Sequence, residues 1–485
     1  MATRTWSSAA STDMNLTTNY SGSGSFATDD LVFDATSVVN AAATANIECN
    51  SITITSGYSG TWALTGYTAT MQGFSDDGIT GGHNYGNAIT CNGASATFHT
   101  GGTGSAKTAT SCVITLNGTT GMTLDCDTNF LPKALVLAAS AVVTYTGAGY
   151  IWPGNAASVT PLQIGNNATF TINGAGIILR AGAEGMSLHS IGTGVTLNGT
   201  GLFGGYSYTN GVTVYLPGYT YTGSGNNVWQ SNSLAATSYI EMTGNINTGT
   251  AMFYIGSSSM SYLGKFSTKN YSITCGTLHA YLGEDADFGS SLISCTRVSG
   301  SVGNTAAWNM GSSQWTVAGS YQATDGITYT VGTSIVTITD TSTITCNGKT
   351  FCNDLILNAN TKTITLADAL SVDNDFTHTA GNLNQNTKVV TVAGDVVLNS
   401  NGTNTYNAAW TIGGNLTWGP TATGTKTGST FTFANASSFN TVPGGHVYTG
   451  PGDISYITGA IVVHEALRAV TPKAVATTFQ DPGVF

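Results

Sequence analysis

One short pattern recurs in register towards the C-terminal end of the chain. It consists of an apolar residue, two further residues, Asp or Asn, and a second apolar residue. Four copies follow one another at spacings of 21, 20 and 20 residues. A period of this length, filled only by short strand-like runs and turns, predicts one coil of a β-solenoid per repeat. The copies begin at Phe351, Val372, Val392 and Ile412 and end at Leu355, Phe376, Val396 and Leu416.

The rest of the chain supports the same fold class. Similar words ending in Asn-Gly lie 25 residues apart at 91–93 and 116–118, and again at 172–174 and 197–199. Apolar and Thr/Ser residues alternate with the period of a strand, and helical periodicity is almost absent before residue 455. We therefore predict an all-β, parallel β-solenoid of 20–25-residue coils. A series of β-sandwiches is the alternative, but it would not keep one register over four repeats.

If this register is right, matched apolar residues of successive coils form columns inside the solenoid. The prediction is specific for Val372, Val392 and Ile412, which should share one inward column. Asp375 and Asp395 occupy a position where Asn415 also occurs. Because Asn can replace Asp there, these side chains are predicted to hydrogen-bond the backbone of a turn rather than to act in catalysis.

Composition excludes several classes of protein. Charged residues make up 8% of the 485 residues, against roughly 25% in an ordinary soluble domain, and 41% are hydrophobic, which is unlike a disordered chain. The net charge of −11 offers no basic stripe, so no nucleic-acid partner is expected. The richest apolar run, 134–143, is half of the ~20 residues that a membrane span needs.

The eight cysteines show no CxxC pair and no Cys/His spacing typical of zinc. Four of them, Cys49, Cys91, Cys275 and Cys346, lie at the ends of similar short sequences that are typical of strands. They are predicted to be small buried hydrophobes rather than disulfides. The seven histidines are scattered without an HxH or HExxH pattern, so we predict no metal site, no nucleophilic site and no cofactor.

Changes in composition divide the chain into four parts. Residues 1–45, with Trp6, form an N-terminal capping segment, 46–320 the solenoid body, 321–450 the C-terminal repeats, and 451–485 a tail. The tail holds the chain's only helix-like run, which Pro472 would end or kink. Phe479 and Phe485 would be exposed apolar groups there, so the tail either docks on a partner or folds back as a cap.

Residues 348–398, GKTFCNDLILNANTKTITLADALSVDNDFTHTAGNLNQNTKVVTVAGDVVL, resemble the repeats of phage virion fibre and decoration proteins and of adhesin-like solenoids. The opening, with Trp6 and Asp29-Asp30, is similar to the first segment of the same group. No apolar stretch follows Arg4, so no signal peptide is expected, which favours the phage virion over an exported adhesin. The resemblance implies a structural or receptor-binding role, a homotrimer and contacts with other virion proteins, and it supplies no catalytic residue.

Two clusters are candidates for binding. Glu284, Asp285 and Asp287 form the densest acidic group. They are interpreted as a solvated corner, a calcium site beside Gly289, or the carboxylates of a glycoside hydrolase. The second cluster is an aromatic-rich insertion at 203–229, whose rings either stack on host glycans or fill the solenoid wall or a subunit interface. Its aromatic residues are Tyr206, Tyr208, Tyr215, Tyr219, Tyr221 and Trp229.

The sequence as a whole favours a non-enzymatic bacteriophage virion protein: a fibre, spike or capsid-decorating β-solenoid. It would be made in the host cytoplasm and would contact sister subunits and host surface polysaccharide. A polysaccharide depolymerase on the same scaffold and a bacterial surface adhesin are the alternatives.

Overall fold

The computed structural model shows a parallel β-solenoid with coils of roughly 22 residues, which confirms the predicted fold class. The chain divides into two units, Met1–Phe266 and Ser267–Phe485. The described residues are 2–7, 11–21, 26–36, 39–77, 83–101, 107–154, 161–181, 186–188, 190–207, 213–231, 239–256, 264–301 and 306–419, with the strands 423–426, 431–433, 438–441, 447–449, 454–456 and 462–463 beyond them.

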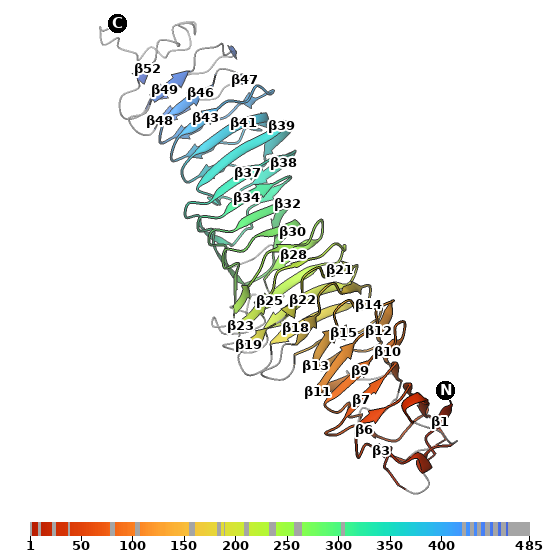
Figure 1. The fold of residues 1–485 in the computed structure, drawn as a ribbon. Helices are drawn as coiled ribbons and strands as arrows, with labels where there is room; N and C mark the ends of the chain where they lie inside the picture. The colour runs from red at the N-terminus through yellow and green to blue at the C-terminus, as the bar shows by residue number, and fades with distance from the viewer. Residues whose placement is uncertain are drawn as a thin grey trace, which may run out of the picture. The chain divides into compact units, whose positions relative to one another are not determined.

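The first unit contains a nine-stranded parallel sheet, here called the first sheet, to which successive coils contribute one strand each (Figure 1). Alternate residues of its strands point inwards and form a buried apolar column that includes Leu31, Ile52, Phe74 and Phe98. The residues between them point outwards. Its strands are β1 (Thr3–Thr5), β2 (Asp30–Phe33), β5 (Ser51–Ile54), β8 (Gly73–Asp76), β10 (Thr97–Thr100), β12 (Met122–Cys126), β14 (Val142–Tyr145), β17 (Thr169–Ile172) and β21 (Thr196–Gly199).

A second ladder of the same unit closes the coils on another side. Cys91 stacks between Met71 and Leu116, and Leu116 stacks on Leu137, all of them buried. Cysteine thus occupies an ordinary column position, as a small apolar side chain would. Its strands include β7 (Thr68–Met71), β9 (Ala88–Cys91), β11 (Lys107–Leu116) and β13 (Phe130–Leu137).

All eight cysteines are free and buried, which confirms the prediction that they serve as small hydrophobes. Burial raises the pKa of the Cys91 and Cys126 thiols to about 12. In the second unit Cys275 of β30 (Ile273–Ala280) stacks directly on Cys295 of β32 (Leu292–Gly300). Thiols with pKa values this high hold little thiolate at neutral pH and are therefore poor nucleophiles.

The second unit keeps the register that the repeat predicts. Val372, Val392 and Ile412 pair in one parallel sheet, and their exposed fractions are 1%, 1% and 0%. This confirms the predicted inward column. The strands that carry them are β40 (Leu370–Val372), β42 (Val390–Val392) and β45 (Trp410–Ile412). The second apolar position of the repeat forms a further column, which comprises Leu355, Phe376, Val396 and Leu416.

The Asp/Asn position of the repeat links each coil to the next, as predicted. Asp354 Oδ1 accepts a hydrogen bond of 3.1 Å from the backbone N–H of Asp375, and Asp375 Oδ1 one of 2.7 Å from that of Asp395. Asp395 Oδ1 in turn accepts bonds from the backbone N–H of Asn415, at 2.7 Å, and from its side-chain amide. These four residues, here called the corner ladder, hold turns whose backbone donors would otherwise lack partners.

The described residues at both ends of the chain add strands to the solenoid ladders. Residues 1–45 already contribute β1 and β2 to the first sheet, and Trp6 is buried against Tyr20 and Phe33. In the tail, β51 (Ile454–Tyr456) and β52 (Val462–Val463) extend the ladders, so the predicted helix-like character is wrong at the residues of β52. Pro472, Phe479 and Phe485 lie outside the described residues. The part of the chain that the structure describes contains no helix with the length and hydropathy of a membrane span.

One buried column contains a histidine where its neighbours are leucines. His378 of β41 (Phe376–Asn384) stacks between Leu357 and Leu398, is fully buried, and neither ring nitrogen makes a hydrogen bond of normal geometry. Burial lowers its pKa to about 4, against a smaller opposing effect of the Gly381 backbone. The ring is therefore neutral in the folded chain at neutral pH.

We expect His378→Leu to stabilise the second unit, and the gain to grow as the pH falls. An unfolded histidine takes up a proton below about pH 6.5, whereas the folded one does so only near pH 4. The wild type therefore loses stability as the pH falls from about 6.5 to about 4, by about 3 kcal/mol in all. Urea unfolding of both proteins at pH 7, 5.5 and 4 measures the difference, and a constant difference would contradict the prediction.

Candidate functional site

A group of ionisable side chains on the outer surface of the first unit surrounds His99. Register pairs His99 of β10 with Ser75 of β8 and with Asp125 of β12. Because side chains alternate along a strand, Phe98 and Thr100 enter the core and His99 faces outwards. Asp77 and Asp127 follow directly after β8 and β12, and so lie at the same edge of the sheet.

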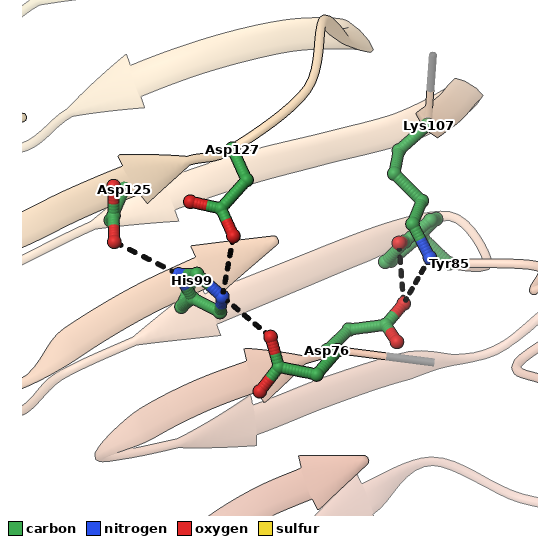
Figure 2. Close-up of polar contacts among 7 residues, drawn as sticks. Asp76, Tyr85, His99, Lys107, Asp125 and Asp127 are labelled. Atoms are coloured by element: carbon green, nitrogen blue, oxygen red, sulfur yellow. Dashed lines mark hydrogen bonds and ion pairs between the residues drawn. The ribbon is translucent and has the colours of Figure 1, made fainter. Parts of the chain in front are cut away.

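The imidazole of His99 lies among three carboxylates, here called with it the His99 cluster (Figure 2). Its Nδ1 is 3.0 Å from Asp125 Oδ2, and its Nε2 is 2.8 Å from Asp77 Oδ1 and 3.9 Å from Asp127 Oδ2. The exposed side-chain fractions are 16% for His99, 42% for Asp77, 31% for Asp125 and 54% for Asp127. The ring is thus largely covered, while the carboxylates remain in contact with solvent.

The charges of the cluster favour the protonated ring in the absence of another cation. Partial burial alone would lower the pKa of His99, but hydrogen bonds and charge from Asp77 and then from Asp125 outweigh it. The net effect raises the pKa above its ordinary value. An imidazolium has two N–H donors, one for each of these carboxylates.

Gly101 leaves room beside the polar atoms of the cluster. A Cβ atom at this position would collide with Asp77 Oδ1 and His99 Nε2 and would crowd Asp127 Oδ2. The residue therefore has to be glycine for the three side chains to converge. The cluster also borders a shallow groove of about 330 Å³ on the outer face of β5, β8 and β10, whose hydroxyl groups come from Ser51, Thr53, Ser75 and Thr97.

A second ionic group lies directly beneath, inside the solenoid. Asp76 is fully buried and accepts a hydrogen bond of 2.6 Å from the Tyr85 hydroxyl. His83 Nδ1 lies 2.9 Å and Lys107 Nζ 3.8 Å from its Oδ2 (Figure 2 shows Tyr85 and Lys107). Burial alone would raise the pKa of Asp76, but His83, Lys107 and Tyr85 together lower it below its usual value. This group is enclosed, so it stabilises the fold rather than meeting a ligand.

The carboxylates of the predicted acidic group at residues 284–287 do not meet at one site. Glu284 is buried, whereas Asp287 of β31 (Asp285–Asp287) is exposed. Asp285 Oδ1 accepts a bond of 2.7 Å from the Ala307 N–H, and Asp287 Oδ1 one of 3.1 Å from the Asn309 side-chain amide. Both aspartates thus lie in a strand and link it to a neighbouring coil. Among the described residues, the group of three side chains with ligand atoms close enough for a metal is instead Asp77, His99 and Asp127.

For three of the six aromatic residues, burial distinguishes between the two interpretations of the cluster. Tyr219, Tyr221 and Trp229 are exposed by 5%, 0% and 0%, and therefore cannot contact a glycan. Trp229 Nε1 donates a hydrogen bond of 3.1 Å to the Tyr219 hydroxyl, and both rings pack against Phe203 inside the coil. They fill the solenoid wall, which was the alternative. Tyr215 of β23 (Thr213–Leu216) is half-buried. The side chain of Tyr206 and the whole of Tyr208 lie outside the described part of the chain.

The His99 cluster does not stand out in the sequence because its residues lie far apart in the chain. Asp77 and Asp125 lie 22 and 26 residues from His99, about one coil before it and one coil after. That spacing is a usable signal once a solenoid is assumed, because residues one coil apart stack.

No protein-family model matches the chain, and comparison with curated proteins and with solved structures finds no significant match.

Proposed function

We propose that the protein is a structural component of a bacteriophage virion, a fibre, spike or capsid-decorating β-solenoid that is exposed to the host surface. The observation that carries this proposal is the corner ladder. There, Asp354, Asp375 and Asp395 each hold the backbone of the next coil and are not left free for chemistry. The resemblance of residues 348–398 to virion repeats supports the same assignment.

The outer faces fit a protein that packs against copies of itself and other virion proteins. Beyond the His99 cluster, the outward positions of β14 and β17 include Thr144, Thr169 and Thr171, which are short and uncharged. Such a surface can approach a partner without desolvating many ions. Closed symmetry is the default for homo-oligomers, and a trimer is the state that the resemblance implies.

The proposal is tested on purified phage particles. Antibodies raised against the recombinant chain should label intact particles at a fixed site in electron microscopy, and the chain should remain with the particles through a high-salt wash. Its copy number, from quantitative mass spectrometry, should be a multiple of three. Recovery of the chain only from the particle-free lysate would refute a virion role.

A second candidate function, a polysaccharide depolymerase, is favoured by the hydroxyl-lined groove that ends at His99. Carboxylates beside a groove are the groups that glycoside hydrolysis requires. This function predicts release of reducing ends from the host capsule, and loss of that release in Asp77→Asn/Asp127→Asn. Asp285→Asn, which removes a carboxylate from strand β31 of the second unit, is the matched control. No release by the wild type would exclude the function for that capsule.

A further inference from the structure

We propose that Asp77, His99 and Asp127 bind a divalent transition-metal ion such as Zn²⁺ or Co²⁺. The ligand atoms would be His99 Nε2 and one carboxylate oxygen from each aspartate, which lie within 4.8 Å of one another. The three residues come from three successive coils, so the ion would join these coils at one edge of the first sheet. This inference is independent of the proposed function.

The donor set suits this class of metal. An imidazole nitrogen and carboxylate oxygens are common zinc ligands, with bonds of roughly 2.0–2.2 Å. Two ligand atoms on a tetrahedral ion with such bonds are separated by roughly 3.3 Å. The present separations of Nε2 from the two carboxylates, 2.8 and 3.9 Å, lie on either side of that value. Asp127 is more than half exposed and can rotate to close the longer gap.

Asp125 supplies the support that a metal-binding histidine usually has. Its Oδ2 lies 3.0 Å from Nδ1, so it can accept the Nδ1 hydrogen and fix the ring. That tautomer leaves the Nε2 lone pair directed towards Asp77 and Asp127. Metal-binding histidines commonly donate their other ring N–H to a carboxylate in this way. Asp125 is therefore a positioning residue in the site and not one of its ligands.

Charge and space agree with this assignment. Three carboxylates surround a single imidazole, and the nearby cation Lys107 faces Asp76 in the interior instead. A dication with a neutral ring balances three carboxylates better than a singly charged imidazolium does. The glycine at position 101 keeps Cβ atoms out of the space between Asp77 and His99. Three protein ligands would leave a further coordination position for water or an oxygen ligand.

The test uses the full chain, stripped with a chelator and titrated with Zn²⁺ by calorimetry at neutral pH. We expect one ion per chain, and a loss of affinity of at least tenfold in His99→Ala and in Asp77→Asn. Asp125→Asn should weaken binding by about 10- to 100-fold, as expected for a supporting carboxylate. Absence of Zn²⁺ binding by the wild type at millimolar concentration would overturn the proposal.

His279→Ala is the matched control. His279 also forms a part-buried contact between coils, but its ring nitrogens face the hydroxyls of Ser299, at 2.9 Å, and Ser301, at 3.2 Å, both of which lie in the following coil. It should bind Zn²⁺ like the wild type, and equal losses in His279→Ala and His99→Ala would overturn the assignment. Circular dichroism shows whether each variant is folded. If His99→Ala does not fold, the near-ultraviolet and visible spectrum of Co²⁺ bound to the wild type decides, since thiolate charge-transfer bands in the near ultraviolet would place the ion at a cysteine instead.

Discussion

Replacing Asp76 with alanine is expected to destabilise the first unit by about 3–5 kcal/mol, the usual effect of removing one partner from a buried ion pair. The substitution leaves Lys107 and His83 enclosed without the carboxylate that faces them, and removes the acceptor of the Tyr85 hydroxyl. Urea unfolding at pH 7, followed by circular dichroism, measures the loss. A change below 1 kcal/mol would show that the interior group contributes little.

The neighbouring residue provides the control, because Asp77 faces solvent on the other side of the same strand end. Asp77→Ala should change stability by no more than about 1 kcal/mol, as is typical of exposed ion pairs. The pKa of Asp76 is lowered in the folded chain, so its contribution is fully present above the ordinary aspartate pKa of roughly 3.9. It is lost as the pH falls through the lower folded value. The difference between wild type and Asp76→Ala should therefore shrink only in strong acid.

We also expect a large loss of stability when a carboxylate is placed in the inward column of the second unit. Val392→Asp would bury an acidic group between the apolar side chains of Val372 and Ile412. We expect a loss of about 4 kcal/mol or more at pH 7, sufficient to unfold the surrounding coils. Limited proteolysis should then cleave near this strand in the variant and not in the wild type.

Thr391→Asp adds the same charge one residue away. Thr391 is exposed on the opposite face of β42, between Ser371 and Thr411 of the neighbouring coils. Its substitution should change stability by about 0.5 kcal/mol or less, as for most surface changes. Similar losses in the two variants would show that the inward and outward faces of this sheet are assigned wrongly.

The repeat made the fold predictable because stacking forces equivalent residues into equivalent places. A strand has a period of two, so the spacing that puts Val372 inside also puts Val392 and Ile412 inside. The Asp/Asn position was predictable for the same reason, since it recurs at the same offset from these residues. Where the repeat is regular, one correctly placed residue determines its neighbours.

The His99 cluster and the packing of the aromatic rings could not be predicted in this way, because the coils of the first unit differ in length. In the first unit the step between paired residues varies from 20, as for Thr68 and Ala88, to 27, as for Thr169 and Thr196. Without a constant step, the alignment of Asp77 with His99 could not be read from the letters. The sequence also does not show whether the rings of Tyr219 and Trp229 point into or out of the solenoid, because aromatic residues are favourable on both faces of a sheet.

The corner ladder also bears on how such a gene can evolve. Each aspartate accepts a hydrogen bond from the backbone of the coil that follows, and a backbone N–H is present in every coil whatever its side chains. A recombination event that duplicates or deletes one 20-residue module therefore creates a junction in which every donor still finds its acceptor. Insertion of only part of a module shifts the register of all later coils, unless the extra residues form a loop that projects from the solenoid. The solenoid can thus lengthen or shorten by whole coils, while the outward side chains of each coil can vary.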